Sequence, residues 1–245
     1  MLKKIEIVLR NLTGGIVFFI LLIFGIFLLL LTYITKEKRI IGEYARYSIR
    51  ILVFIFGLKV RIYGEENLKS LKGKFIIVGN HQSYLDPIVL YSYLKGVPRF
   101  FVRHDVFSLP IIGHGLKVVG FIPVVRKHPK KAKEAIYKAI EYIDRSKSEA
   151  PLVIFPEGTR TRNGKLNRFK KGAFIISKEK DLPLLPVAFS GFFEAMPRGK
   201  FYIKPMEVKI KYLKPIYPEE FKDKSINDYK EFVKQMISKE IELRG

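Results

Sequence analysis

The chain has 245 residues, a formal net charge of +22 at pH 7 and no cysteine. Without cysteine it can form no disulfide, no thiolate metal site and no cysteine nucleophile. A charge this positive indicates an anionic partner, either a nucleic acid or an anionic membrane surface. The length leaves room for one catalytic domain and an appendage.

Residues 14–33 form an uncharged run rich in Phe, Ile and Leu. At ~1.5 Å per residue, a helix of this length just crosses a hydrocarbon core ~30 Å thick. The alternatives are a cleaved signal peptide and a buried helix of a soluble protein. The run is longer than the apolar core of a signal peptide, and no small-residue cleavage site follows it. We therefore expect this segment to insert into a membrane.

A second apolar run, residues 51–56, is too short to cross a bilayer. Basic residues stand on both sides of the first run: Lys3, Lys4 and Arg10 before it, and Lys36, Lys38, Arg39, Arg46 and Arg50 after it. Positive charge at both ends favours a helical hairpin that dips into one leaflet over a single crossing. The sequence thus predicts a membrane-anchoring helical segment over 1–60. The larger part, 61–245, is expected on the cytoplasmic face of the inner (cytoplasmic) membrane.

From Arg61 onward, segments with strand patterns alternate with segments with helix patterns. Strands are predicted at 75–78, 99–103, 120–126, 151–155 and 182–190, with a half-exposed or edge strand at 208–212. Helices are predicted at 87–94, 129–145, 171–179 and 225–241, and 106–119 as a packed loop or short helix. This alternation is typical of an α/β domain, here with a mixed, largely parallel sheet flanked by helices.

A histidine and an aspartate follow the first of these strands, His81 directly after Gly79-Asn80 and Asp86 five residues later. Residues five apart in a continuous helix are rotated by about 140°, so these two side chains meet only if the backbone turns. Pro87 supports a turn, because it disfavours helical backbone before it and suits a first helical position. Asp86 could then orient His81 as a general base. The alternative is an N-capping aspartate beside an ordinary polar histidine.

Two other predicted strands end in small or basic residues, Arg126 after one and Glu157, Gly158 and Arg160 after the other. The carboxyl ends of strands in an open α/β sheet form the usual ligand crevice. Arginine binds phosphate well because its planar guanidinium can donate two hydrogen bonds at once. We expect Arg126 and Arg160 to bind phosphate. The basic run that follows, 162–171, is expected to be mainly a solvated surface.

These motifs together strongly resemble those of the glycerolipid acyltransferases, in particular the 1-acylglycerol-3-phosphate acyltransferases. Four blocks match in order: residues 80–86 resemble the HxxxxD block of that family, and 120–126, 155–160 and 182–187 resemble its second, third and fourth blocks. The resemblance covers about residues 74–189. Members of such families also carry a membrane-associated N-terminus. Many have a lysine between the first two blocks, where this chain has Arg103-His104.

The resemblance implies an α/β enzyme that moves a fatty acyl group from a thioester to the sn-2 hydroxyl of 1-acylglycerol 3-phosphate, giving phosphatidic acid. His81 would be the base and Asp86 its orienting partner. Arg126, Arg160 and Arg103 would bind the acceptor phosphate, with Glu157, Gly158 and Thr159 shaping the acceptor site.

The same resemblance implies acyl carrier protein or coenzyme A as the thioester carrier, and lysophosphatidic acid and an anionic phospholipid surface as lipid partners. We expect no cofactor, and no metal either, because the remaining histidines, His104, His114 and His128, show no HExxH-type spacing. A thioester is already activated, so no covalent nucleophile is needed, and Ser190 lacks the glycine of a nucleophile elbow.

Two rival interpretations remain. One keeps the chemistry and changes the acceptor to glycerol 3-phosphate, another lysophospholipid or a lipid A precursor. The other is a basic, membrane-tethered binding protein without catalytic activity, which explains the charge and the anchor but not the set of four blocks. A nucleic-acid partner is not expected, because no recognised binding module is present.

Overall fold

The computed structural model describes residues 2–35, 38–110, 112–118, 120–124, 134, 136–138, 140–141, 143–144 and 149–242. Its described helices are α1 (Leu2–Thr35), α2 (Lys38–Ile55), α3 (Glu65–Ser70), α4 (Leu85–Tyr93), α5 (Ile112–Val118), α7 (Gly172–Lys180), α8 (Phe192–Ala195) and α9 (Ile226–Glu242), with 3-10 turns η1 (His104–Ser108) and η2 (Pro218–Phe221).

The described strands form one sheet of seven, in the spatial order β1-β7-β6-β2-β5-β3-β4. They are β1 (Lys59–Tyr63), β2 (Ile76–Gly79), β3 (Arg99–Arg103), β4 (Ile122–Val124), β5 (Leu152–Ile154), β6 (Leu184–Ser190) and β7 (Glu207–Tyr212). The run from β6 to β4 is parallel, β7 is antiparallel to β6, and β1 is parallel to β7. The expected α/β fold with a mixed, largely parallel sheet is confirmed.

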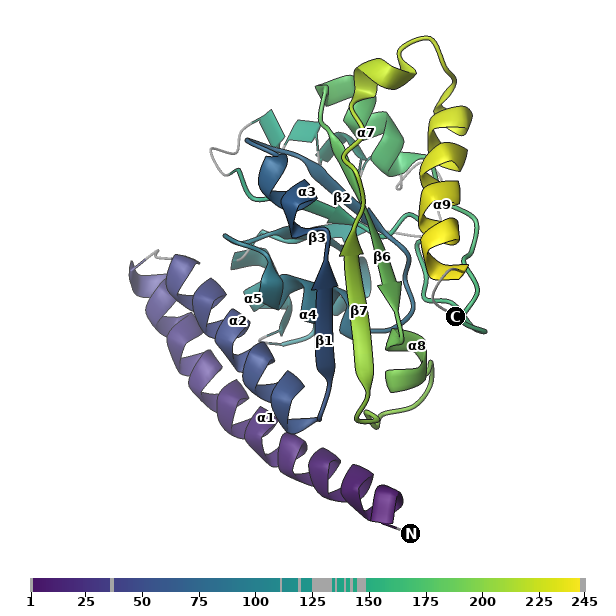
Figure 1. The fold of residues 1–245 in the computed structure, drawn as a ribbon. Coiled ribbons are helices and arrows are strands. Elements are labelled where there is room, and N and C mark those ends of the chain that lie inside the picture. The colour runs from purple at the N-terminus through teal and green to yellow at the C-terminus, as the bar shows by residue number, and fades with distance from the viewer. Residues whose placement is uncertain are drawn as a thin grey trace.

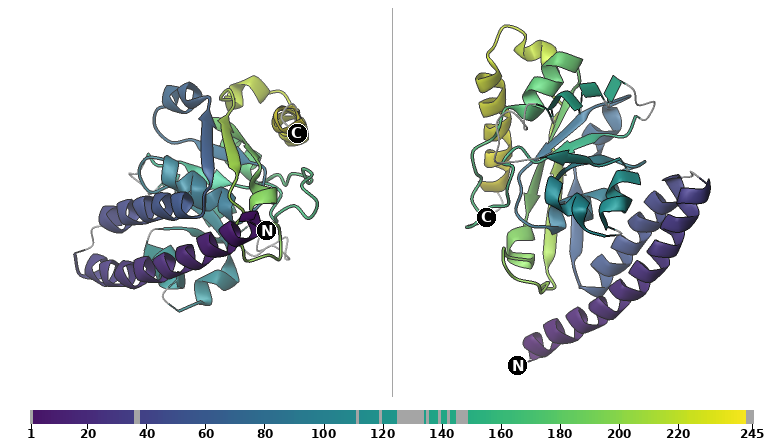
Figure 2. Two further views of the ribbon diagram at one scale, coloured as in Figure 1. Left: turned by 60° about the horizontal axis from the view of Figure 1, so that its bottom comes forward. Right: turned by 180° about the vertical axis from the view of Figure 1, so that it is seen from behind.

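Helices cover both faces of the sheet (Figure 1, Figure 2). Because successive residues of a strand point to opposite faces, Ile76 and Val78 of β2 join the core under α7 and α9, while Ile77 joins the core under α4. The hairpin of α1 and α2 lies outside α4, on the second of these faces. His81 lies two residues after the end of β2, the fourth of the seven strands, so it emerges at the centre of the sheet.

The N-terminal helices lie side by side and antiparallel (Figure 1), and Arg10 of α1 donates to the carbonyl of Ile55 at the end of α2. The helix α1 begins at Leu2, well before the apolar run that the sequence singles out. Among the described residues it is the one helix long and apolar enough to cross a membrane. Its most apolar window has a mean hydropathy of 3.1 and is only 11% buried. The short run 51–56 belongs mostly to α2.

The structure adds one strand, decides between the two alternatives for another and moves the start of one helix. The strand β1 was not predicted; it begins at Lys59, before the expected start of the α/β part at Arg61. The strand β7 is half-exposed as expected but lies between β1 and β6, so it is not an edge strand. Helix α4 begins at Leu85, which places Asp86 within its first turn rather than at an N-cap.

The amphipathic helix expected over 129–145 falls largely outside the described residues. Those of its residues that the structure describes are helical, and Ile136, Ile140 and Ile143 pack with the core under α7 and α9.

Candidate active site

The turn between β2 and α4 brings the histidine and the aspartate together. His81 Nδ1 lies 2.8 Å from Asp86 Oδ2, and both residues are buried. An ionised carboxylate only accepts hydrogen bonds, so the proton of this bond belongs to Nδ1. Nε2 is then left as the basic nitrogen, and His81 lines a large cavity. The arrangement is that of a histidine held in one tautomer by a carboxylate.

Asp86 is fully buried and organises the turn around it. Its Oδ2 also accepts the backbone N–H groups of Gln82, at 2.6 Å, and Ser83, at 2.8 Å. Its Oδ1 is buried with no hydrogen-bond partner among the described residues. Burial raises the pKa of Asp86, and the bonds from His81, Ser83 and Gln82 oppose that rise. One carboxylate therefore shapes the loop and fixes the imidazole at the same time.

Glu157 ties the β5 loop to the histidine. Its Oε1 accepts the backbone N–H of His81 at 2.7 Å, and its Oε2 accepts the backbone and side-chain N–H groups of Asn167 at 3.0 and 2.7 Å. Burial raises the pKa of Glu157, and these hydrogen bonds oppose the rise. Both carboxylate oxygens are occupied by protein donors, so Glu157 shapes the site by positioning its two loops.

Two further contacts fix the end of β2. The side chain of Asn80 bonds both the N–H and the carbonyl of Phe189 in β6, at 2.8 and 2.9 Å. The imidazole of His81 stacks on the ring of Phe155, with centroids 4.4 Å apart. The histidine is thus held from three sides, by Asp86, by Glu157 and by an aromatic face. A base held in this way needs little reorganisation during reaction.

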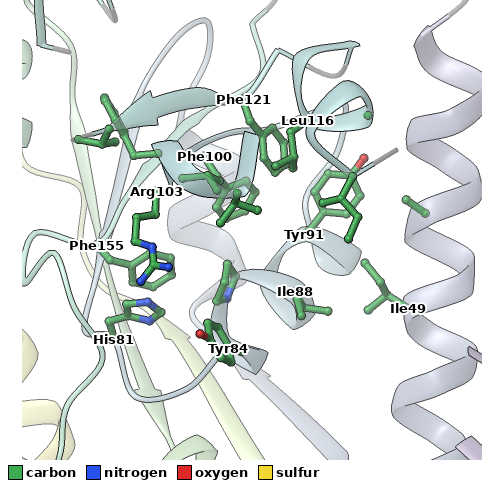
Figure 3. A pocket seen from close by; sticks show the side chains of 18 of the residues that line it. Ile49, His81, Tyr84, Ile88, Tyr91, Phe100, Arg103, Leu116, Phe121 and Phe155 are labelled. Carbon is green, nitrogen blue, oxygen red and sulfur yellow. The ribbon is translucent and has the colours of Figure 1, made fainter. Parts of the chain in front are cut away.

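A cavity of about 890 Å³ runs from His81 toward the N-terminal hairpin. Figure 3 shows His81, Arg103 and Phe155 on one side of it and Leu116, Tyr91 and Ile49 on the other. Its lining is predominantly apolar, and α1 (including Leu22, Gly25 and Leu29), α2, α4 and α5 contribute to it together with β3, the loop after β5 and α7. A pocket of this size and polarity suits a hydrocarbon chain.

Among the described residues, the lysines and arginines that line the cavity are Arg103, Arg160, Lys170 and Arg198, and no aspartate or glutamate joins them. The guanidinium of Arg160 lies over the ring of Tyr84, 3.4 Å from its centroid, and its carbonyl accepts a bond from Arg198 at 3.2 Å. Arg103 pairs with Asp105 and is otherwise exposed. An anionic group at the His81 end would meet positive charge from several elements.

The residues after β5 follow a tight turn. Gly158 has φ +68°, a region that glycine occupies at little cost, and a Cβ there would lie 2.9 Å from Lys170 Nζ. Gly158 and Thr159 both line the cavity. Arg126 lies outside the described residues.

The model of the acyltransferase family matches residues 59–190, more than half of the chain. The chain belongs to the acyltransferase family. This acyltransferase is 34% identical over 160 residues to a chloroplast 1-acyl-sn-glycerol-3-phosphate acyltransferase of Brassica napus, covering 65% of its own length and 45% of that protein. It is 31% identical over 213 residues to the 1-acyl-sn-glycerol-3-phosphate acyltransferase of Saccharomyces cerevisiae, covering 85% of its own length and 68% of that protein. The chain therefore spans less than half of the first of these relatives.

Among solved structures, the acyltransferase resembles the crystal structure of the 1-acyl-sn-glycerophosphate acyltransferase PlsC from Thermotoga maritima. The TM-score is 0.77 at 23% identity, over 98% of this chain and 96% of that one. This similarity confirms the fold, including the N-terminal hairpin, since nearly the whole of both chains is matched.

The sequence did not predict that Asn80 joins β2 to β6. It assigned Lys170 to the solvated surface, and it did not single out Arg198. The position of Lys170 could have been predicted, because this residue follows the third block within the same loop. The contact of Arg198 with Arg160 joins residues 38 positions apart, and no local pattern marks it.

Proposed function

We propose that this acyltransferase transfers a fatty acyl group from a thioester to the sn-2 hydroxyl of 1-acylglycerol 3-phosphate and so forms phosphatidic acid. One observation carries the proposal. A histidine held by a carboxylate lies where a basic rim meets an apolar cavity. A lysophosphatidate has the same order of groups, with phosphate, hydroxyl and hydrocarbon chain.

The chemistry needs one base. Nε2 of His81 takes the proton of the acceptor hydroxyl as its oxygen attacks the thioester carbonyl. The tetrahedral intermediate then collapses with cleavage of the carbon–sulfur bond, and His81 returns the proton to the departing thiolate. Asp86 stabilises the imidazolium between the two steps. Oxyanion donors are expected among backbone N–H groups at the strand-to-helix turns.

The basic side chains hold the acceptor. Arg160 is the main phosphate ligand in this proposal, since its stacking on Tyr84 fixes its guanidinium at the cavity edge. Lys170 and Arg198 line the cavity together with Arg160 and add positive charge around the phosphate. Arg103 and Arg126 are assigned to the same phosphate. Fixing the phosphate places the neighbouring hydroxyl at a constant distance from His81, which turns acyl transfer into an effectively intramolecular step.

The apolar cavity receives an acyl chain between the catalytic domain and the hairpin. Because α1 and α2 form one wall of the cavity, the anchor is also part of the substrate site. A lipid could then enter from the bilayer without passing through water. We assign the hairpin to the inner leaflet of the cytoplasmic membrane and the α/β domain, residues 61–245, to the cytoplasmic side.

The acyl donor is assigned to acyl carrier protein, with coenzyme A thioesters also accepted. A chain with 45 Lys and Arg residues against 23 Asp and Glu attracts an acidic carrier electrostatically. The same charge concentrates anionic lipid at the site.

A competition assay tests the proposal. Purified enzyme in anionic vesicles is given a labelled acyl thioester, with lysophosphatidate and glycerol 3-phosphate offered together. Phosphatidate is the expected product. Preferential acylation of glycerol 3-phosphate would reject the acceptor, and the absence of any acylated product with either acceptor would reject the reaction. Acyl carrier protein and coenzyme A thioesters, compared at equal concentration, decide the donor.

A further inference from the structure

The loop between α8 and β7 carries the most exposed aromatic side chain in the described part of the protein. Phe201 is 94% exposed, more than any other large hydrophobic residue there, including those on α1. Its neighbours Arg198 and Lys200 are basic and exposed, and Lys204 follows three residues after Phe201. A fully exposed phenylalanine among cations is unusual on a surface that faces only water.

This exposure belongs to a well-built loop. The N–H of Lys200 donates to the carbonyl of Pro197 at 3.1 Å, which closes a turn, and Gly199 within it has φ +83°. At the base, the N–H of Lys204 donates to the carbonyl of Ala195 at 2.9 Å. Hydrogen bonds thus close the loop both at its turn and at its base, and they hold Phe201 outward.

The base of this loop is joined to the N-terminal hairpin. The side chain of Asn11 in α1 bonds both the carbonyl and the N–H of Ile203, each at 2.8 Å. The N–H of Lys59, just after α2, donates to the carbonyl of Met206 at 2.9 Å. A Cβ on Gly57 would lie 2.7 Å from Pro205, so the chain leaving α2 also touches the loop. Figure 1 shows the segment before β7 beside the first turns of α1.

The position of Asn11 along α1 determines the depth of the loop relative to the membrane. It stands three residues before the uncharged run 14–33, where the charged part of the helix ends. Around it, Val8 and Leu12 of α1 are 64% and 62% exposed. If the apolar run lies in hydrocarbon, Asn11 and the loop tied to it lie at the head-group level, where aromatic and basic side chains concentrate.

We propose that the loop 198–202 is a second membrane contact, in which Phe201 enters the interface of an anionic bilayer and Arg198 and Lys200 meet lipid phosphates. The inference rests on the proposed membrane association of the hairpin and extends it. The long axis of the hairpin and the loop, which Asn11 joins, together fix how the domain is oriented on the membrane. The hairpin alone would leave the domain free to rotate about that axis. The second contact holds the basic rim of the active site, which includes Arg198, toward the lipid head groups.

The chain contains no tryptophan, so one substitution provides a specific probe. In Phe201→Trp, emission is measured in buffer and with vesicles of phosphatidylcholine or of phosphatidylcholine with phosphatidylglycerol, some carrying bromine on the acyl chain. The matched control is Tyr217→Trp, because Tyr217 is 46% exposed and follows β7 at its opposite end. Co-sedimentation of each variant with the same vesicles is measured in parallel.

For Phe201→Trp we expect a blue shift and quenching by the brominated lipid, larger with phosphatidylglycerol, and for Tyr217→Trp no change. Unshifted and unquenched emission of Phe201→Trp in protein that co-sediments would overturn the loop contact and leave the hairpin in place. Failure of all variants to co-sediment would overturn both. A shift produced by an acidic acyl carrier protein, and not by vesicles, would show a protein-binding loop and overturn the lipid assignment.

A second pair of variants measures the contribution to binding. Phe201→Asp is expected to weaken partition into phosphatidylglycerol vesicles severalfold, because it places negative charge at the interface, while Tyr217→Asp leaves partition unchanged. Since both side chains are exposed, neither change should alter the melting temperature. Equal partition of the two variants would contradict the proposal.

Discussion

His81 Nδ1 lies 2.8 Å from Asp86 Oδ2, and this bond joins the end of β2 to the first turn of α4. His81→Ala removes the only group placed to take the acceptor proton in the proposed mechanism. We expect acyl transfer to fall by about 10²- to 10⁴-fold with the melting temperature and vesicle binding nearly unchanged. His114→Ala, at an exposed position of α5, is the control. Substantial transfer by His81→Ala would remove the mechanism.

The pH dependence of stability tests the environment of Asp86. Burial raises the pKa of Asp86, so the folded state binds its proton more tightly than the unfolded chain does. The contribution of Asp86 to stability is then full below its ordinary pKa and is lost as the pH rises through the raised pKa. Asp86→Asn does not titrate. Its melting temperature relative to wild type should therefore increase as the pH rises above the ordinary pKa of an aspartate, about 4.

The same variant separates stability from catalysis. An amide at position 86 does not hold the imidazole in the required tautomer, so we expect acyl transfer to fall by about 10²- to 10⁴-fold even where the variant is the more stable protein. A melting-temperature difference that shrinks as the pH rises would show instead that the hydrogen bonds outweigh burial and lower the pKa of Asp86.

The sequence predicts the strands that carry the site because their signals are local. A buried run followed by Gly79-Asn80 indicates β2 and the turn after it. Because proline disfavours helical backbone before it, Pro87 predicts the turn that brings His81 to Asp86. The strand β1 was missed, although Lys59–Tyr63 alternates between exposed and half-buried residues and could have been identified. It was overlooked because its charged residues alternate with the apolar residues that pack on the core.

Contacts between distant segments could not be predicted in this way. Asn80 bonds Phe189, 109 positions away, and Asn11 bonds Ile203, 192 positions away. Each is an ordinary polar residue in the sequence, and only the folded chain gives it a partner. Glu157 was expected to shape the acceptor site, but its partners could not be predicted: its two oxygens bond His81 and Asn167.

Arg160→Ala should mainly weaken use of the acceptor. A hydrogen bond to a charged group contributes about 1.5–3 kcal/mol, and ~1.4 kcal/mol corresponds to a factor of ten. We expect KM for lysophosphatidate to rise by roughly 10- to 100-fold, with a smaller change in kcat. Arg162→Ala, an exposed residue outside the cavity lining, should behave as wild type. An unchanged dependence on lysophosphatidate concentration in Arg160→Ala would refute the phosphate role.

Glu157→Gln tests whether the β5 loop positions the histidine. The amide has one acceptor oxygen where the carboxylate has two, so an N–H of His81 or of Asn167 loses its partner. A buried unsatisfied donor costs about 1–3 kcal/mol, and the free energy of unfolding should fall by that amount.

Activity of Glu157→Gln should fall at saturating acceptor as well, because the backbone of His81 loses its anchor. Glu179→Gln, at an exposed position of α7, serves as the control for stability and activity. Normal stability and kcat with only a raised KM would assign Glu157 to direct acceptor binding.

The length of the apolar cavity should set the preference for acyl chains. Leu116 of α5 lies on the side of the cavity away from His81 (Figure 3). Its neighbour in the chain, Gly115, also lines the cavity, and a Cβ at Gly115 would lie 3.8 Å from Leu29 of α1. Gly115→Leu adds a side chain across this gap and shortens the space available to hydrocarbon. Helix α5 should tolerate the change, because leucine has a higher helix propensity than glycine.

We expect the optimum of Gly115→Leu to move to shorter acyl chains in a series of thioesters that differ only in chain length, with little change in rate for the shortest. Gly15→Leu is the matched control, because a Cβ there meets no atom within 4 Å and Gly15 does not line the cavity. An equal loss of rate with every chain length would mean that the chain does not reach α5. The acyl group would then occupy only the part of the cavity near His81.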